Sequence, residues 1–260
     1  MVLESVWLPC CAGKRDESQE TRSMSSAIIV IPCYNESKRL DAGQFEDFVK
    51  QAHNVRFLFV NDGSTDHTSQ VLETLRRSHP DRFDVYHLPR NVGKAEAVRL
   101  GLLRAFASCP DYAGFWDADL ATPLDIIPSF CDLLDRKPDI EMVFGSRVQL
   151  LGRSIDRNLM RHYLGRTFAT MVALVLNLKV YDTQCGAKLF RRSDGVIALF
   201  QETFITRWLM DVEIIARLIQ ARRGTDLPRA EAVIYEAPLS EWRDVRGSKL
   251  KTSDFFEGHV

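Results

Sequence analysis

Five short apolar segments recur at nearly constant spacing in the first part of the chain, and this repeat constrains the fold more than any other feature of the sequence. The segments read AIIVIP at 27–32, VRFLFV at 55–60, FDVYHL at 83–88, YAGFWD at 112–117 and EMVFGS at 141–146. Apolar runs of strand length that alternate with helix-length segments of mixed polarity are typical of successive β-strand and α-helix units. The sequence therefore predicts an α/β fold with a mostly parallel sheet.

Helix signals occupy two of the segments between these strands. Asp66 precedes apolar residues at helical spacing over 71–75, and Asn91 precedes such residues over 95–106. Because short polar side chains are favoured at helix N-caps, we expect Asp66 and Asn91 to cap two crossover helices.

The character of the sequence changes after Arg147, where a polar, arginine-rich stretch begins. Apolar spacing then predicts helices around 158–177 and near 209–221, and a last strand near 231–238. No clear linker separates the two parts, so we expect one domain over 27–260.

The first 26 residues are expected to form a disordered leader rather than a secretory signal. They carry Glu4 early and become polar at GKRDESQETRSMSS, and Met24 is a candidate for the functional start. The longest apolar stretch, FATMVALVLNLKV at 168–180, is well short of the roughly 20 apolar residues that a membrane span requires. It predicts a buried or interfacial helix.

Charge and cysteine content narrow the classes of partner. With 34 basic and 35 acidic residues the net charge is -1, so no overall field attracts nucleic acid or an anionic membrane. The six cysteines form no CxxC pair and no Cys/His ligand spacing, which predicts reduced thiols in a cytoplasmic protein. Partners must therefore bind at local sites.

Polar clusters follow each of the five predicted strands. They read CYNES, NDGSTD, RNVGK, DADL and GSR in chain order. Each alone is typical of a turn or a helix cap. Because ligands bind beyond the carboxyl ends of the strands in open parallel sheets, all five at one edge predict a ligand site.

Two aspartates of the fourth cluster, Asp117 and Asp119, are one residue apart. If the extended geometry continues, they share a face and can converge on one cation; in a turn they would serve as caps. Two carboxylates beside a diphosphate supply the oxygen ligands that Mg²⁺ and Mn²⁺ prefer. No GxGxxG follows the first strand and no GxxxxGK[ST] is present, which disfavours a dinucleotide oxidoreductase and a P-loop NTPase.

Together the motifs resemble those of glycosyltransferase family 2. They are IPCYNE, VNDGSTD, RNVGKAEAV, DADLATP, GSR, DTQCGAKLF and EAPLSEWRDVRGSKLK, over about residues 27–251. Within the family they most resemble the polyprenyl-phosphate glycosyltransferases, the dolichyl-phosphate glucose and mannose synthases. The resemblance implies a GT-A fold with a Rossmann-like sheet, and an inverting, metal-dependent transfer of a hexose from a nucleotide sugar to a polyprenyl or dolichyl phosphate. It divides the domain into a nucleotide-sugar-binding part, 27–147, and an acceptor-binding part, 148–260.

The resemblance assigns nucleotide-binding roles to five residues: Pro32, Tyr34, Glu36, Asp62 and Lys94. The first three would line the nucleoside pocket, Asp62 would hydrogen-bond the base, and Lys94 would approach the nucleotide. The alternative for Tyr34 is packing at the end of a strand.

The same resemblance makes the aspartate pair a DXD motif. Asp117 would lie near the ribose and the metal, and Asp119 would be the principal ligand of Mg²⁺ or Mn²⁺. The mannose synthases carry a polar amide two residues after the second aspartate, whereas this chain has Ala121, as the glucose synthases do. This difference favours UDP-glucose over GDP-mannose as the donor.

Arginines are the expected contacts of the acceptor. By resemblance, Arg147 and Arg161 would hold the lipid phosphate, which guanidinium groups bind through charge-assisted hydrogen bonds. Arg243, Ser248 and Lys249 lie on a glycine-containing segment that would close over the diphosphate. The alternative for that segment is a frayed tail.

Four further residues are expected in the site. Asp182, Gln184 and Lys188 would line the sugar pocket by resemblance. Asp211 would orient the sugar or the acceptor; in relatives with hydroxyl acceptors the corresponding acid serves as a general base, but a phosphate acceptor is already ionised and needs none.

The expected partners are thus a nucleotide sugar and a polyprenyl phosphate, without nucleic acid. The apolar helix near 168–178, or a membrane partner subunit, would keep the protein peripheral on the cytoplasmic membrane face. Two alternatives stay open: a family 2 enzyme that uses GDP-mannose or a hydroxyl acceptor on a glycan, and a non-catalytic nucleotide-sugar-binding module.

Overall fold

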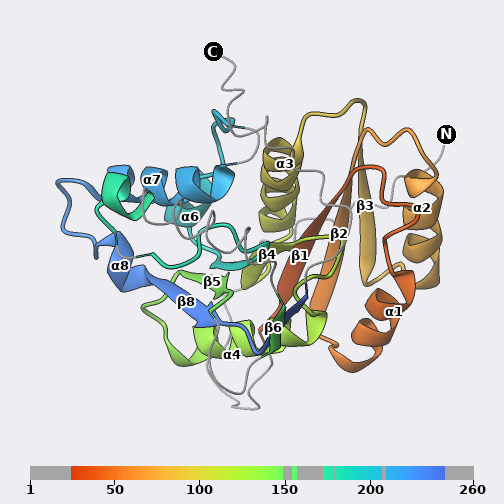
Figure 1. Cartoon of the computed structure of the whole chain (residues 1–260), viewed down its shortest axis with the longest axis horizontal. Coiled ribbons are helices and arrows are strands. Elements are labelled where there is room, and N and C mark those ends of the chain that lie inside the picture. The colour runs from red at the N-terminus through yellow and green to blue at the C-terminus, as the bar shows by residue number, and fades with distance from the viewer. Residues whose placement is uncertain (1–24, 149–153, 157–171, 179, 207–208, 244–260) are drawn as a thin grey trace.

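The central element of the protein is a seven-stranded sheet with helices on both faces (Figure 1). The computed structural model of the chain describes residues 25–148, 154–156, 172–178, 180–206 and 209–243. The strand order is β3-β2-β1-β4-β7-β5-β8. The five apolar segments form the five predicted strands, which are β1 (Ala27–Cys33), β2 (Val55–Asp62), β3 (Phe83–Leu88), β4 (Tyr112–Trp116) and β5 (Met142–Ser146).

Two later strands complete the sheet. β8 (Ile234–Pro238) pairs with β5 in parallel, and it follows a short helix, α8 (Ala230–Val233), that takes up the start of the predicted strand at 231–238. β7 (Ala187–Arg191) inserts between β4 and β5 and is antiparallel to both. The sheet is therefore mostly parallel, as predicted.

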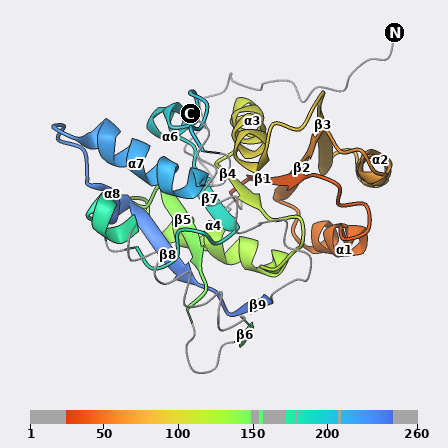
Figure 2. The same ribbon diagram turned by 45° about the horizontal axis from the view of Figure 1, so that its top comes forward.

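The helices divide between the two faces of the sheet because successive residues of a strand point to opposite sides. Ile29 and Ile31 of β1 belong to a core with α1 (Ala42–Gln51), α2 (Thr68–Ser78) and α4 (Ile127–Arg136). Ile28 and Val30 belong to a second core with α3 (Lys94–Ala107), α6 (Asp194–Ala198), α7 (Met210–Arg222) and α8. Figure 2 shows α3, α6 and α7 together, apart from α1 and α2.

Three short elements lie outside the main sheet and the longer helices. A single 3₁₀ turn, η1 (Leu124–Ile126), precedes α4. β6 (Ser154–Asp156) and β9 (Glu241–Arg243) form a separate two-stranded parallel sheet. Figure 2 shows this pair beyond the edge of the main sheet.

The two predicted helix caps have different outcomes. The Asp66 carboxylate accepts a hydrogen bond from Thr68 N at 3.0 Å at the start of α2, although His67 occupies the N-cap position itself. The prediction for Asn91 was wrong, because α3 begins later, after Gly93 with φ of +94°. Asn91 instead donates from Nδ2 to the Asp62 carbonyl at 3.3 Å.

The second half of the sequence agrees in part with the expectations. The helix expected near 209–221 is α7. Of the helix expected around 158–177, only residues 172–176 are described as helical, and the preceding residues lie outside the described part of the chain. No helix among the described residues is long and apolar enough to cross a membrane.

The cysteines follow the expectation of reduced thiols only in part. Cys33, Cys131 and Cys185 are free and buried. Cys109, by contrast, is disulfide-bonded, which corrects the prediction that all thiols are reduced.

The order of the strands creates a topological switch point at the carboxyl edge of the sheet, and the region outside the ends of β1 and β4 is here called the crevice. β1 pairs in parallel with β2 on one side and with β4 on the other. The strands β2 and β3 therefore extend the sheet on one side of β1, and β4 extends it on the opposite side. The residues that follow β1, β2, β3 and β4 therefore share one edge. In open α/β sheets this switch point is where ligands bind.

Candidate active site

The DAD turn, Asp117 to Asp119, leaves the carboxyl end of β4 and is fixed by main-chain hydrogen bonds. Asp117 N donates to the Gly186 carbonyl at 3.0 Å, and Ala121 N donates to Asp119 Oδ1 at 3.2 Å. Leu120 has a φ of +52°, a left-handed conformation that a leucine rarely adopts. Such strained positions persist only where the surroundings impose them, so the turn holds both carboxylates in one arrangement.

Both aspartates are partly buried and influence each other. Burial and the charge of Asp117 raise the pKa of Asp119 above its ordinary value, while the Ala121 N–H, Lys94 and Arg39 act in the opposite direction. Two like charges held together favour the binding of a cation.

Gly186 is a site residue that the sequence analysis missed. A Cβ atom at this position would lie 1.9 Å from Asp117 Oδ2 and 2.3 Å from Asp117 Cγ. Only glycine leaves room for the carboxylate. The motif DTQCGAKLF contains this glycine, but nothing in the sequence relates it to Asp117 because the two strands that carry them are far apart in the chain.

Lys94, the first residue of α3, lies beside the DAD turn, and its contact with a nucleotide stays a prediction. Its Nζ is 2.5 Å from Asp117 Oδ1. Burial would lower the pKa of Lys94, but Asp117, Asp211 and Asp119 outweigh it and raise the pKa. The ammonium therefore stays charged, beside the two aspartates and within the field of Asp211.

The carboxylates expected at the nucleoside are engaged with protein groups. Glu36, only 6% exposed, accepts hydrogen bonds from Arg39 Nε at 2.7 Å and Nη2 at 2.9 Å. Asp62, 3% exposed, accepts from Val92 N at 2.7 Å and Gly93 N at 3.0 Å. In this structure both residues fix the loops that border the crevice, and their contact with a nucleoside stays a prediction.

Pro32 and Tyr34 have partly exposed side chains at the carboxyl end of β1. That position agrees with either role foreseen for Tyr34, nucleoside binding or strand-end packing, and does not decide between them.

Arg39 is a second residue that the sequence analysis missed. The hydrogen bond to Glu36 raises its pKa despite partial burial, and Asp119 and Asp117 raise it further. The guanidinium therefore contributes positive charge next to the DAD turn. Its place in the sequence, just after YNES, gives no signal of this proximity.

Arg147 and Asp182, expected at the acceptor and the sugar respectively, form one ion pair. Arg147 Nε and Nη2 lie 2.6 and 2.7 Å from the two oxygens of Asp182. The Arg147 guanidinium also lies 5.3 Å from the centre of the Trp242 ring. Burial would lower the pKa of Arg147, but Asp182 raises it.

Glu236 on β8 supports that ion pair through the main chain; it is the first residue of the motif EAPLSEWRDVRGSKLK, but the sequence analysis gave it no role. Its carboxylate accepts the N–H groups of Tyr181, at 2.8 Å to Oε2, and of Asp182, at 2.8 Å to Oε1. These hydrogen bonds fix the main chain of Asp182, the residue whose carboxylate pairs with Arg147.

Arg243 reaches the site through its main chain. Arg243 N donates to the Ala121 carbonyl at 3.0 Å, which attaches β9 to the DAD turn. Its exposed side chain pairs with Glu241. The other predicted acceptor contacts, Arg161, Ser248 and Lys249, lie outside the described residues.

Lys188 does not line an open sugar pocket, which corrects the prediction. The residue is fully buried, and its Nζ lies 2.5 Å from Asp211 Oδ1. Asp211 is itself 7% exposed. Lys188 is therefore connected to the site by its contact with the Asp211 carboxylate.

Gln184, also expected at the sugar, is more accessible than Lys188, and its contact with the sugar stays a prediction. Its side chain is partly exposed, and its Nε2 atom has no hydrogen-bond partner in the described part of the structure, as is also true of Ser146 Oγ and Thr183 Oγ1. Buried polar atoms normally have partners, so polar groups of a ligand or water are expected here.

The carboxylates present fit a divalent cation that is coordinated partly by the protein and partly by a substrate. No group of three or more His, Cys, Asp or Glu among the described residues is placed to hold a metal alone. Asp117 and Asp119 supply two carboxylates, and Mg²⁺ in phosphate-transfer sites commonly takes only one or two from the protein. A metal site of this kind is complete only with a diphosphate.

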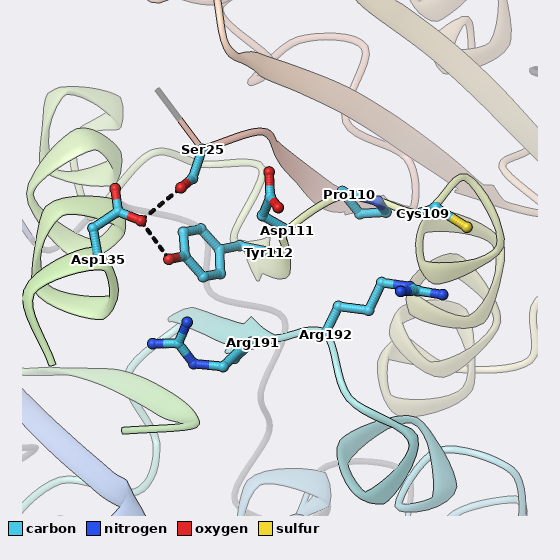
Figure 3. A pocket seen from close by; sticks show the side chains of 8 residues that line it. All are labelled: Ser25, Cys109, Pro110, Asp111, Tyr112, Asp135, Arg191 and Arg192. Atoms are coloured by element: carbon cyan, nitrogen blue, oxygen red, sulfur yellow. Dashed lines mark hydrogen bonds between the residues drawn. The ribbon is translucent and has the colours of Figure 1, made fainter. Parts of the chain in front are cut away.

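A cavity of about 380 Å³ lies at the opposite edge of the sheet from the DAD turn (Figure 3). Its Asp135 carboxylate accepts hydrogen bonds from Ser25 Oγ and Tyr112 Oη, both at 2.6 Å. Burial and Asp135 raise the pKa of Tyr112 to about 12. Arg191 donates to the carbonyls of Leu134 and Ile140. These polar groups hold the ends of strands and helices together.

Comparison with known proteins places the chain among glycosyltransferases. The model of the family described as Glycosyl transferase family 2 matches residues 28–195. The dolichyl-phosphate beta-glucosyltransferase of Mus musculus is 34% identical over 238 residues, covering 85% of this chain and 68% of that protein. The enzyme of the same name from Saccharomyces cerevisiae is 30% identical over 243 residues, with 85% and 68% covered. The chain thus spans about two thirds of the length of these relatives.

The fold is shared with a solved glycosyltransferase. The glucosyl-3-phosphoglycerate synthase of Mycobacterium tuberculosis, in complex with Mn²⁺, UDP and phosphoglyceric acid, aligns with a TM-score of 0.56 and 19% identity, over 85% of this chain and 72% of that one. This likeness concerns the fold alone, and the predicted GT-A fold is confirmed.

Proposed function

The chain belongs to glycosyltransferase family 2, and we propose on this basis that it transfers glucose from UDP-glucose to dolichyl phosphate with inversion at the anomeric carbon. The names of the curated relatives support glucose and dolichyl phosphate. Ala121, in place of an amide ligand, supports the same donor.

One observation carries the proposal: the carboxylates of Asp117 and Asp119 lie beside the Lys94 ammonium at the crevice between β1 and β4. A nucleoside diphosphate needs positive charge on its phosphates and, as a leaving group, gains negative charge in the reaction. Mg²⁺ or Mn²⁺, held by Asp117 and Asp119, would supply Lewis-acid stabilisation of that charge. Lys94 would add a fixed ammonium at the same place.

The remaining groups serve the acceptor. A phosphate oxygen attacks the anomeric carbon, the bond from that carbon to UDP breaks, and the configuration inverts in this single displacement. Because the phosphate is already ionised at neutral pH, no group of the chain has to remove a proton. Arg147 offers N–H groups for the phosphate beyond the two that Asp182 uses, since a guanidinium has five.

A lipid acceptor requires contact with a membrane, and we place the protein peripherally at its cytoplasmic face. Leu174 and Val175, on the helical residues 172–176, are 77% and 83% exposed. They belong to the apolar stretch that the sequence predicts at an interface. Large exposed apolar side chains of this kind support binding at the surface of a bilayer.

The test of the proposed function is the partition of labelled product. Incubation with UDP-[¹⁴C]glucose, Mn²⁺ and dolichyl phosphate should move label into an organic phase. Label that stays in water-soluble glycan would support a hydroxyl acceptor instead. Binding of UDP-glucose with no release of UDP in the presence of any acceptor would support a non-catalytic module.

The conservative substitution Arg147→Lys is expected to weaken use of the acceptor selectively. Lysine keeps the charge, and with it the compensation of Asp182, but loses the planar fork that binds two phosphate oxygens. We expect the KM for dolichyl phosphate to rise by about tenfold, the size of one good hydrogen-bonded charge contact, with little change in the KM for UDP-glucose.

The matched control is Arg136→Lys, because Arg136 is an exposed arginine that pairs with Asp132 far from the crevice. It should leave both constants unchanged. If Arg147→Lys raised the KM for UDP-glucose and left that for dolichyl phosphate intact, Arg147 would belong to the donor side.

A further inference from the structure

Lys188 carries a positive charge in the interior of the sheet. Its residue position on β7 pairs with Phe115 of β4 and Phe144 of β5, and its Nζ lies 5.4 and 4.9 Å from the centres of those two rings. The side chain is fully buried. An ammonium removed from water is strongly destabilising unless other groups compensate its charge.

The compensation comes from one carboxylate and two carbonyls. Asp211 Oδ1 lies 2.5 Å from Lys188 Nζ, and the ammonium donates to the carbonyls of Thr183 at 3.0 Å and Cys185 at 2.7 Å. Asp211 lies in the first turn of α7. The ion pair therefore joins the start of α7 to the turn that precedes β7.

Two of the three partners of the ammonium, Asp211 and Cys185, connect it to the reaction site. On one side, Asp211 is among the carboxylates that raise the pKa of Lys94, whose own ion-pair partner is Asp117. On the other side, Gly186 directly follows Cys185, accepts the Asp117 N–H at 3.0 Å and makes room for the Asp117 carboxylate. Packing alone does not explain Lys188, because an apolar side chain would fill the space without a buried charge.

We propose that Lys188 is a positioning residue that holds the Asp211 carboxylate in one orientation at the reaction site. The inference rests on the proposed function, since it supposes that Asp211 orients the sugar or the acceptor. Lys188 itself touches neither substrate. It acts by fixing Asp211 relative to the turn that shapes the position of Asp117.

The test is a set of variants of the full chain, assayed with UDP-[¹⁴C]glucose and dolichyl phosphate in detergent micelles. Lys188→Met keeps the length of the side chain and removes the charge. We expect kcat to fall about tenfold or more, because misplacement of a positioned group costs rate, while the KM for UDP-glucose changes less than about threefold. The rise in thermal midpoint caused by UDP and Mn²⁺ should persist, which shows that the donor side is folded.

Asp211→Asn completes a double-mutant cycle with Lys188→Met. Each single variant leaves one buried charge without its partner and should lower the thermal midpoint. The double variant has no lone charge, so its midpoint should recover relative to both singles. Its kcat should fall no further than that of the worse single variant, because the two residues act as one unit.

Arg222→Met is the matched control. Arg222 Nη2 lies 2.6 Å from Glu141 Oε2, and this ion pair ties the last turn of α7 to the residue before β5. Its loss should lower the thermal midpoint as the loss of a half-buried pair does, but leave kcat unchanged. If Lys188 served only to hold α7 in place, Lys188→Met would behave like Arg222→Met, with a lower thermal midpoint and an unchanged kcat.

Two results would overturn the proposal. The first is a Lys188→Met variant with kcat within about twofold of the parent chain while Asp211→Asn is impaired. The second is a double variant in which the two losses of rate multiply. If the parent chain itself transfers no glucose to dolichyl phosphate, the proposed function fails, and the midpoints of the cycle still decide whether the two residues are coupled.

Discussion

The substitution Asp119→Asn is expected to lower kcat/KM for glucose transfer by about 10²- to 10³-fold, the cost of removing one preorganised electrostatic contact from a transition state. The amide has the shape of the carboxylate but not its charge, so it binds a divalent cation weakly. The structure places Asp119 in a turn fixed by its own bond to Ala121 N and by the left-handed Leu120. Its charge is the property that the variant changes.

The measurement is a steady-state assay at several Mn²⁺ concentrations, with the thermal midpoint recorded for each protein. Asp125→Asn is the control, because Asp125 is an exposed aspartate of η1 a few residues further along the chain. It should behave as the parent does. Removal of the metal from the parent with EDTA should reproduce the defect of Asp119→Asn. Full activity of the Asp119→Asn variant in metal-containing buffer would exclude the mechanism.

The substitution Gly186→Ala should produce a loss of similar kind without removing a charged group. The added methyl would lie 1.9 Å from Asp117 Oδ2, a distance that no relaxed structure allows. Asp117 must turn away from its place beside Lys94, since the three nearest atoms to the methyl all belong to the Asp117 carboxylate. We expect kcat/KM to fall by about 10²-fold, as for other displacements of about 1 Å in a reaction site.

Gly195→Ala provides the matched control for that substitution. A Cβ atom at Gly195, in α6, would have no atom within 4 Å, and alanine is the better helix former. This variant should be fully active and slightly more stable, by roughly 0.5–1 kcal/mol. Equal activity of the Gly186→Ala and Gly195→Ala proteins would mean that Asp117 does not need its present position. The thermal midpoints of both proteins, measured alongside the activities, distinguish a loss of activity at the site from a loss caused by unfolding.

The sequence predicts the first half of the fold well because each strand there has a simple signal. β1, β2, β4 and β5 are almost entirely buried, since helices cover both sides of the sheet, whereas the edge strand β3 exposes His87; each of the five ends at a polar cluster. The meeting of CYNES, NDGSTD and DADL at one edge follows from the parallel arrangement alone. The resemblance to a family then gives each cluster a role.

The antiparallel strand β7 is the main feature that the sequence does not predict. Its residues AKLFR include Lys188, and a lysine within a central strand contradicts the apolar pattern on which strand prediction depends. Its buried charge becomes understandable only when Asp211, from another part of the chain, lies 2.5 Å away. The link between Gly186 and Asp117 is non-local in the same way.

The ion pairs of the site are a second class of feature beyond the sequence. Arg147, Asp182 and Glu36 lie in motifs that point to substrates one by one, but the structure couples Arg147 with Asp182, and Glu36 with Arg39, which lies outside the motifs. Sequence patterns identify charged residues near a site and do not state which charges compensate one another. Three-dimensional distances decide that question.

The most direct test of the central claim is the identification of the lipid product by NMR. The purified chain would receive UDP-glucose and GDP-mannose in equal amounts, together with dolichyl phosphate and Mn²⁺. The account predicts a single organic-soluble product, β-linked glucosyl phosphate on dolichol, which is absent when EDTA replaces the metal. A mannosyl lipid, an α-linked glucosyl phosphate, or the same product formed in EDTA would contradict it.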